Sequence, residues 1–145
     1  EHGSTFGGNP VAGKVAIAAL EVVTEEKLAE NARRLGNIFR KEMNRIIKGT
    51  DLVNAVRGRG LLNAILINDT EDSSTAMDIC ISLKENGLLA KPTHGNIIRF
   101  APPLVMTEEQ LMECVSIIEK TITNPKKAHA ADMNISVRFI LVAQP

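Results

Sequence analysis

The sequence contains no tryptophan, no tyrosine and only 4 phenylalanines among its 145 residues. Proteins that bind single-stranded nucleic acid stack bases on aromatic side chains, and cages for quaternary ammonium groups are also aromatic. The chain also has no excess of positive or negative charge, because 17 lysines and arginines balance 17 aspartates and glutamates. A neutral chain offers no electrostatic footprint for nucleic acid or an anionic membrane. We therefore expect neither as a partner.

Cysteine is scarce as well. Cys80 and Cys114 both lie in apolar helical patterns without CxxC spacing, so we expect buried, reduced thiols and a reducing compartment. His2, His94 and His129 share no common spacing, which argues against a metal site. No stretch reaches the roughly 20 apolar residues that a membrane-spanning helix needs.

A chain of this length suits one domain with one hydrophobic core. It opens at Glu1 inside a glycine-rich loop rather than at methionine. We expect a fragment of a longer protein, with any targeting segment outside the sequence.

The first half of the chain predicts two helices after a loop over residues 1–9. Asn9 can cap the helix that Pro10 begins, which should run to about Val23. Thr24, followed by two glutamates, predicts the start of a second helix. This helix should end near Gly49 and carry one apolar stripe, formed by Leu28, Ala32, Leu35, Phe39, Met43 and Ile46.

The second half predicts strands mixed with helices. Arg57 to Gly60 reads as a turn or bulge that feeds a strand over residues 61–67. A helix should follow over about 74–86, and its inward face would carry Ala76, Ile79, Cys80 and Leu83.

Two short strands are expected next, over residues 88–92 and 97–100. A hairpin turn over residues 93–96 should join them, since Gly95 and Asn96 tolerate positive φ. Thr107 to Gln110 forms a capping box for the last helix. The inward side chains of that helix should be Leu111, Val115, Ile118 and Ile122.

This order predicts an α/β (α+β) two-layer domain, in which helices cover a small sheet. Residues 124–145 do not fit the scheme. Pro125 breaks the last helix, and the apolar run over residues 135–142 has no obvious place in the sheet. The tail is either an alternative terminus or a structured element.

Arg99 is the most suggestive single residue. It lies mid-strand, on the face shared with Ile97 and opposite to Ile98 and Phe100. A guanidinium there needs water, a carboxylate or a phosphate, because an unpaired buried charge is costly. Its planar fork matches a carboxylate with two hydrogen bonds. The alternative is an arginine that reaches solvent or pairs with a helix acid.

Three other features could bind anions or carry chemistry. The opening loop combines the Ser4 and Thr5 hydroxyls with glycines, which suits a phosphate, although it could simply be a flexible entry to the helix. The segment from Arg57 to Gly60 could bind an anion, but a structural bulge is favoured. Lys91 could form a Schiff base, but a solvated lysine is favoured.

Four stretches resemble the class III pyridoxal-phosphate-dependent aminotransferases, and they occur in the family's order. They are HGSTFGGNP at 2–10, VRGRGLL at 56–62, GLLAKPTHG at 87–95 and IIRFAPPL at 97–104. The first and last are shared widely in that family. The third, together with LLNAI at 61–65, is similar to its ornithine aminotransferase branch. The resemblance covers residues 1 to about 123.

The resemblance implies the small C-terminal domain of the aspartate-aminotransferase-like fold, with a mostly antiparallel sheet. Residues 1–23 would be the phosphate loop and the linking helix from the large domain. Residues 24–123 would form the small domain. Residues 124–145 would be an atypical tail, for which disorder and an ordered structure both stay open. In the family, the hydroxyls of the glycine loop reach the cofactor phosphate of the neighbouring subunit. That role falls on Gly3, Ser4 and Thr5.

The arginine of the family's IIRFAPP stretch binds the substrate carboxylate, a role that falls on Arg99. The implied cofactor is pyridoxal 5'-phosphate, with amino-acid and 2-oxo-acid substrates. The implied assembly is a homodimer or higher homo-oligomer, and the implied compartment is the mitochondrial matrix, with the cytoplasm as the alternative.

The implied reaction moves the δ-amino group of ornithine to 2-oxoglutarate, giving glutamate 5-semialdehyde and glutamate. An acetylornithine or 4-aminobutyrate aminotransferase stays open, as does a truncated, non-catalytic chain that associates with intact subunits. The family's Schiff-base lysine precedes this segment, so we expect no catalytic residue here and no activity from the chain alone.

Overall fold

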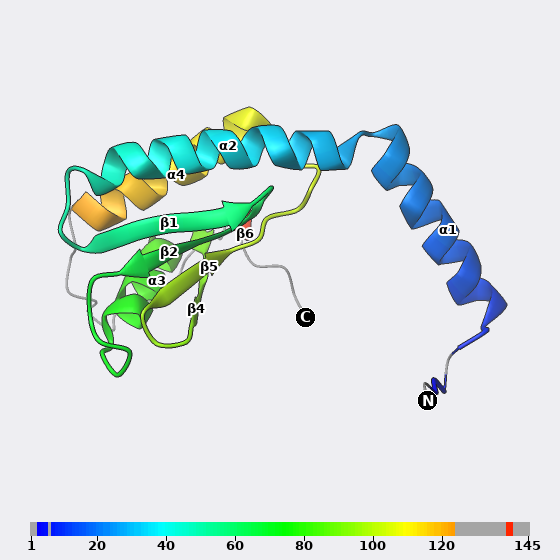
Figure 1. Ribbon diagram of the computed structural model, residues 1–145, viewed down its shortest axis with the longest axis horizontal. Coiled ribbons are helices and arrows are strands. Elements are labelled where there is room, and N and C mark those ends of the chain that lie inside the picture. Colours follow the sequence, from blue (N-terminus) through cyan, green and yellow to red (C-terminus); the bar gives the residue numbers. More distant parts are fainter. Residues whose placement is uncertain (1–2, 6, 124–138, 141–145) are drawn as a thin grey trace.

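The computed structural model describes residues 3–5, 7–123 and 139–140. Helices lie against one side of a small sheet, and the first helix projects away from this body (Figure 1). The helices are α1 (Pro10–Glu25), α2 (Leu28–Ile47), α3 (Thr75–Glu85) and α4 (Glu108–Thr123). The strands are β1 (Val53–Arg59), β2 (Leu62–Ile67), β3 (Leu88–Leu89), β4 (Lys91–Thr93), β5 (Ile97–Phe100) and β6 (Phe139–Ile140).

The main sheet has four strands in the order β1-β2-β5-β4. All its neighbouring strands are antiparallel. The remaining pair, β3 with β6, is parallel. The predicted two-layer α/β class with a mostly antiparallel sheet is therefore confirmed.

The core lies between the sheet and helices α2, α3 and α4. Every member of the predicted stripe on α2 is buried, and so are the predicted inward residues of α3 and α4. The rings of Phe39 and Phe100 meet with their centroids 5.6 Å apart at an angle of 59°. Each such fully buried side chain contributes about 1.5–3 kcal/mol to folding, so this layer supplies most of the domain's stability.

Both predicted helix caps are present. The Asn9 side chain accepts hydrogen bonds from the amides of Val11 and Ala12, at 2.9 and 3.2 Å. At α4, the Thr107 amide donates to the Gln110 side chain at 3.0 Å, and the Gln110 amide donates to the Thr107 hydroxyl at 3.3 Å. This reciprocal pair is the capping box read from the sequence.

The boundary between the first two helices was predicted wrongly. Thr24 does not start the second helix; it belongs to α1, which continues to Glu25. The break comes at Lys27, whose φ of 51° places it in the left-handed region before α2 begins. The preference of acidic residues for the first turn of a helix gives no information about this break. The break depends on the left-handed backbone conformation of a single lysine.

The strand predictions also need correction. The segment from Arg57 to Arg59 is not a turn, because it forms the end of β1, and the irregular register lies earlier, between Val53 and Ala55. Residues 88–92 are two strands in different sheets rather than one. The hairpin turn between β4 and β5 is present, but its positive φ angles are at His94 and Gly95, not at Asn96.

A close contact joins α2 to the β1–β2 hairpin. An added Cβ at Gly36 would lie 1.8 Å from the Gly60 carbonyl oxygen. One helical turn later, Arg40 donates hydrogen bonds to that same oxygen at 3.1 Å and to the Asn63 side chain at 2.8 Å. Asn63 is buried, and its side-chain amide nitrogen donates to the same Gly60 carbonyl oxygen at 3.0 Å. The hairpin tip is thus held directly against the helix backbone.

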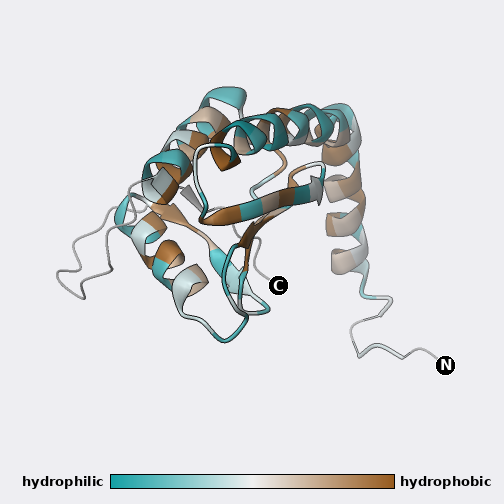
Figure 2. Ribbon diagram, turned by 60° about the vertical axis from the view of Figure 1, so that its left-hand side comes forward, coloured by the Kyte–Doolittle hydropathy of each residue, from teal (hydrophilic) through white to brown (hydrophobic). Residues whose placement is uncertain are grey.

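Helix α1 differs from the other helices because none of its residues is buried. It is nevertheless largely hydrophobic (Figure 2). Its large exposed apolar side chains are Val11, Val15, Ile17, Leu20, Val22 and Val23. A helix of this composition normally buries apolar surface against another element.

Most of the predicted tail lies outside the described residues. Within it, Phe139 and Ile140 form β6 and pair with Leu88 and Leu89. Of the two alternatives left open for the tail, these two residues therefore form a structured element, a strand that lies in a separate two-stranded sheet and not in the main sheet.

The contact at Gly36 gives a paired prediction for two helical glycines. We expect Gly36→Ala to lower the free energy of unfolding by roughly 1–3 kcal/mol, because the added methyl forces the hairpin away from α2. Gly13 on α1 meets nothing within 4 Å. Gly13→Ala should therefore leave stability unchanged or raise it by up to about 1 kcal/mol. Urea denaturation followed by circular dichroism measures both, and equal effects would contradict the packing at Gly36.

Candidate functional site

The sheet has one covered face and one open face. Along β2, Asn63, Ile65 and Ile67 are buried beneath the helices, whereas Leu62 is exposed. Antiparallel register extends this alternation to the other strands. The side chains that share the open face are Ala55, Arg57, Arg59, Leu62, Ala64, Leu66, Lys91, Thr93, Ile97 and Arg99.

Arg99 lies near the middle of this open face. Its neighbours in the strand, Ile98 and Phe100, are buried, and Arg99 itself is exposed, as the alternation predicted. Across the sheet it is opposite Ala64 on β2 and Lys91 on β4. Within the described part of the chain, no carboxylate forms an ion pair with Arg99. The guanidinium is therefore available to an external anion.

The glycine-rich loop precedes α1. Gly3, Ser4 and Thr5 are all exposed. The Gly7 amide donates to the Ser4 carbonyl at 3.2 Å, which turns the chain, and Gly8 has a φ of 79°. His2 and Phe6 lie outside the described residues.

The structure does not bring this loop to Arg99. The 16 residues of α1 separate the two, and a helix of that length spans about 24 Å. Figure 1 shows the N-terminal loop at the far end of α1, away from the sheet. Within one chain, Ser4 and Arg99 therefore cannot contact one small ligand in this conformation.

The loop has donors suited to a phosphate. The Ser4 and Thr5 side chains are exposed, and they donate to no group among the described residues. Added Cβ atoms at Gly3 and Gly8 would meet nothing within 4 Å, which leaves the backbone open to a bulky anion. This donor set fits the phosphate of a cofactor.

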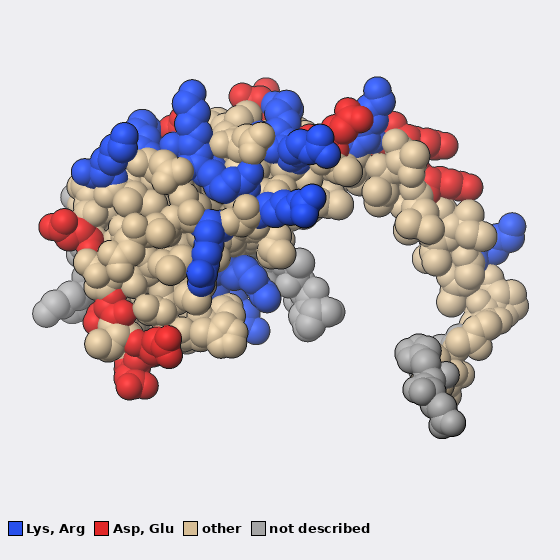
Figure 3. Space-filling view, viewed as in Figure 1, with Lys and Arg blue, Asp and Glu red and all other residues tan. Residues whose placement is uncertain are grey.

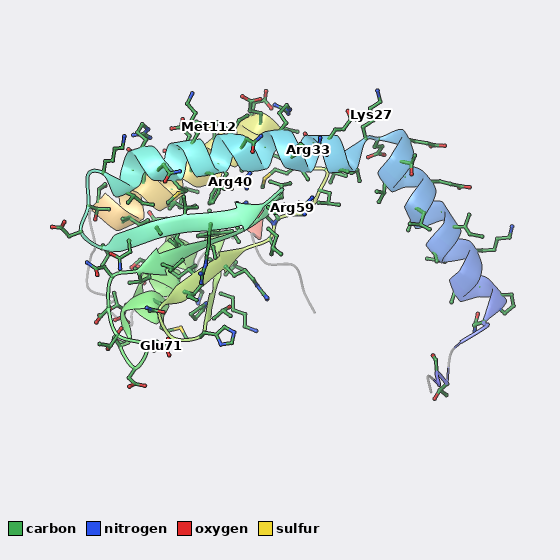
Figure 4. All side chains as sticks on the ribbon, viewed as in Figure 1. Lys27, Arg33, Arg40, Arg59, Glu71 and Met112 are labelled. Atoms are coloured by element: carbon green, nitrogen blue, oxygen red, sulfur yellow. The ribbon has the colours of Figure 1, made fainter. Side chains whose placement is uncertain are left out.

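Sequence reasoning missed two features near the site. Arg57 was placed in a turn, but it lies on β1 and shares the open face with Arg99. Counting the alternation outward from Ile65 would have located it. Arg40 was not singled out, yet it reaches from α2 to the hairpin (Figure 4). No sequence signal marks this contact, because it depends on how the helix packs.

The described residues contain neither a candidate metal site nor a helix that could span a membrane. No three histidine, cysteine or carboxylate side chains gather there in a way that could hold a metal ion. In the same part of the chain, no helix combines the length and apolar character that crossing a bilayer requires.

Comparison with known proteins gives the family. The model of the aminotransferase class-III family matches residues 1–122. The chain belongs to the class III aminotransferases. Mitochondrial ornithine aminotransferases from Drosophila melanogaster and Rattus norvegicus are 61% and 59% identical to it, each over 122 residues. Each alignment covers 84% of this chain but only 27% of the relative.

Solved structures agree with this family. The acetylornithine aminotransferase of Elizabethkingia anophelis matches with a TM-score of 0.81 at 71% identity, covering 84% of this chain and 30% of that one. The ornithine aminotransferase of Plasmodium yoelii matches with a TM-score of 0.76 at 48% identity, covering 84% and 32%. Class III aminotransferases depend on pyridoxal phosphate, so the fit of the loop to a phosphate agrees with the family.

The two cysteines lie away from the open face and give a prediction of their own. Both are buried and free, as expected. Burial raises the pKa of each thiol from 9.0 to about 12. We expect a thiol reagent at pH 8 to modify neither in the native chain and both in denaturant, because the thiolate is the nucleophile.

The raised pKa of the two thiols also makes the stability of the fold depend on pH. The fold favours the neutral thiols, so their contribution to the free energy of unfolding is complete below pH 9 and is lost as the pH rises toward about 12. Rapid native labelling of either cysteine at pH 8 would contradict the packing of α3 and α4.

Proposed function

We propose that the chain is the C-terminal part of an ornithine aminotransferase, which transfers the δ-amino group of ornithine to 2-oxoglutarate. The products would be glutamate 5-semialdehyde and glutamate. One observation carries the proposal: identity near 60% to enzymes of that name over 122 residues. The family model matches residues 1–122, which include the loop and the strand that holds Arg99. The chain spans about a quarter of those relatives, so the activity belongs to a longer protein.

Arg99 would bind the carboxylate of the substrate. Its guanidinium is exposed on the open face and has no carboxylate partner among the described residues. Two parallel hydrogen bonds from a guanidinium to a carboxylate would fix the position and direction of an amino acid or 2-oxo acid. This restraint reduces the entropy lost when the reacting groups meet.

The loop would bind the cofactor phosphate. Ser4 and Thr5 would donate through their hydroxyls, and Gly3 would let the backbone approach. When bound, pyridoxal phosphate supplies the electron sink for amino-group transfer. Because α1 holds the loop far from Arg99 of the same chain, we propose that the loop serves the neighbouring subunit of a homodimer or higher homo-oligomer.

Two alternatives have their own support. The 71% identity to a protein named as an acetylornithine aminotransferase favours N-acetylornithine as the amino donor. The exposed apolar side chains of α1 favour a truncated, non-catalytic chain that associates with intact subunits. For the compartment we propose the mitochondrial matrix, because the names of the fly and rat relatives include that organelle.

The chain by itself should not hold the cofactor covalently. The family's Schiff-base lysine precedes the segment that the chain matches, so no lysine here occupies that place. We expect borohydride treatment with equimolar pyridoxal phosphate to give no stoichiometric labelling of any single lysine in mass spectrometry, only a low level spread over the exposed amines. Stoichiometric labelling of one lysine, abolished by changing that lysine, would refute this.

A chimera tests the function of the segment. Residues 1–122 would replace the matching part of the fly ornithine aminotransferase, and turnover of ornithine and N-acetylornithine would be compared. We expect ornithine turnover, with Arg99→Gln raising KM by about 10- to 100-fold, as loss of charge-assisted hydrogen bonds predicts.

Arg33→Gln provides the matched control. Arg33 is exposed on α2 and is not one of the side chains of the open sheet face, so its loss should leave KM unchanged. A folded chimera that prefers N-acetylornithine would move the assignment to the acetylornithine type. A folded chimera without either activity would overturn the proposal.

A further inference from the structure

Helix α1 leaves large apolar side chains in contact with solvent. It buries none of its residues, whereas α2, α3 and α4 each bury several. Val11, Val15 and Val22 are 71%, 63% and 43% exposed. Exposed apolar side chains that are contiguous mark a surface for protein contacts. The order of residues along α1 indicates what kind of partner fits this surface.

The apolar residues of α1 form two lines, one on each side of Lys14 and Glu21. One line contains Gly13 and Thr24, and the Thr24 hydroxyl donates to the Leu20 carbonyl at 2.9 Å. The other line is apolar throughout, and its spacing alternates between four and three residues, as in the contact line of a coiled coil. We call this second line the α1 seam, and it consists of Val11, Val15, Ala18 and Val22.

Two opposite charges border the α1 seam on the same side. Lys14 and Glu21 are separated by seven residues, which is about two helical turns, so they lie one above the other. Neither forms an ion pair within the part of the chain that the structure describes. Figure 3 shows the charged side chains of α1 along the edge that faces away from the sheet. Another chain can therefore approach them without meeting the body of the domain.

The two charges are placed symmetrically about the middle of the helix. α1 runs from Pro10 to Glu25, so Lys14 is four residues after its first residue and Glu21 is four before its last. In an antiparallel pair of two such helices, Lys14 of each copy would lie beside Glu21 of the other. A parallel pair would instead bring like charges together at both levels. The charge pattern therefore matches a second copy of the same helix in the antiparallel direction.

We propose that α1 is a self-association surface, on which a second copy of the chain binds antiparallel along the α1 seam. The seam supplies the apolar contact, and two ion pairs between Lys14 and Glu21 fix the direction. A helix of 16 residues is about 24 Å long, which gives less than the roughly 1,200 Å² that stable complexes bury. The dimer is therefore weak and reversible. This inference goes beyond the proposed function, because it involves neither the glycine loop nor Arg99.

Sedimentation of the full 145-residue chain at low ionic strength tests the contact along the seam. We expect a monomer–dimer equilibrium with Kd on the order of 100 µM. Val15→Asn should weaken the dimer at least about tenfold, because it removes an apolar contact from each copy. Ile17→Asn is the matched control, since Ile17 is 53% exposed on the other line of α1 and its loss should leave Kd unchanged. Both variants should fold, because neither side chain is buried.

A charge exchange tests the direction of the pair. Lys14→Glu alone and Glu21→Lys alone each create two like-charged pairs, and each should weaken the dimer about tenfold. An equimolar mixture of the two variants should associate nearly as tightly as the unchanged chain, because both pairs between the copies are again of opposite charge. Lys41→Glu makes the same change of charge on α2, where Lys41 is exposed, and should leave Kd unchanged.

Three outcomes would overturn the inference. A chain that stays monomeric up to about 1 mM shows that α1 does not bind its own copy and leaves another part of a longer protein as its cover. A dimer that is unaffected by Val15→Asn uses a different surface. A mixture of the two charge variants that associates no better than either alone excludes the antiparallel pairing. Ornithine turnover by the chimera stands or fails independently of all three.

Discussion

The contact between α2 and the β1–β2 hairpin fixes which side of the sheet becomes the core. Gly36 lets the helix backbone meet the Gly60 carbonyl, and Arg40 ties that carbonyl to the buried Asn63. With the hairpin held there, Ile65 and its neighbours on the covered face pack under the apolar stripe of α2. A strand alternates strictly between two faces, so one covered face forces every second side chain outward.

This one-sided arrangement is the basis of the candidate site. The same alternation that buries Ile98 and Phe100 exposes Arg99 between them. It also places Arg57 and Lys91 in the row of Arg99, although the three residues come from separate strands. No element of the described chain covers these cations. The domain therefore has a charged surface that nothing in the described chain covers, and the chain spans about a quarter of the relatives' length.

Helix α1 positions the glycine-rich loop and contributes no buried residue to the core. It buries none of its own residues and carries the glycine loop away from the sheet. Apolar surface of this extent is normally covered in a complete protein. The loop and Arg99 would then serve one reaction only through neighbouring parts of an assembly, which is the arrangement that the proposed function requires.

Features that depend on local pattern could be predicted from the residues alone. The 3.6-residue repeat of apolar side chains predicted the buried faces of α2, α3 and α4. The capping residues Asn9 and Thr107 predicted where two helices begin, and the order of the motifs indicated the family. The three-dimensional packing was needed to locate the break at Lys27, the extent of β1, the division of residues 88–93 between two sheets, and the placing of Arg57, Arg99 and Lys91 in one row across the main sheet. These depend on register and packing between distant segments, and no single stretch of sequence contains that information.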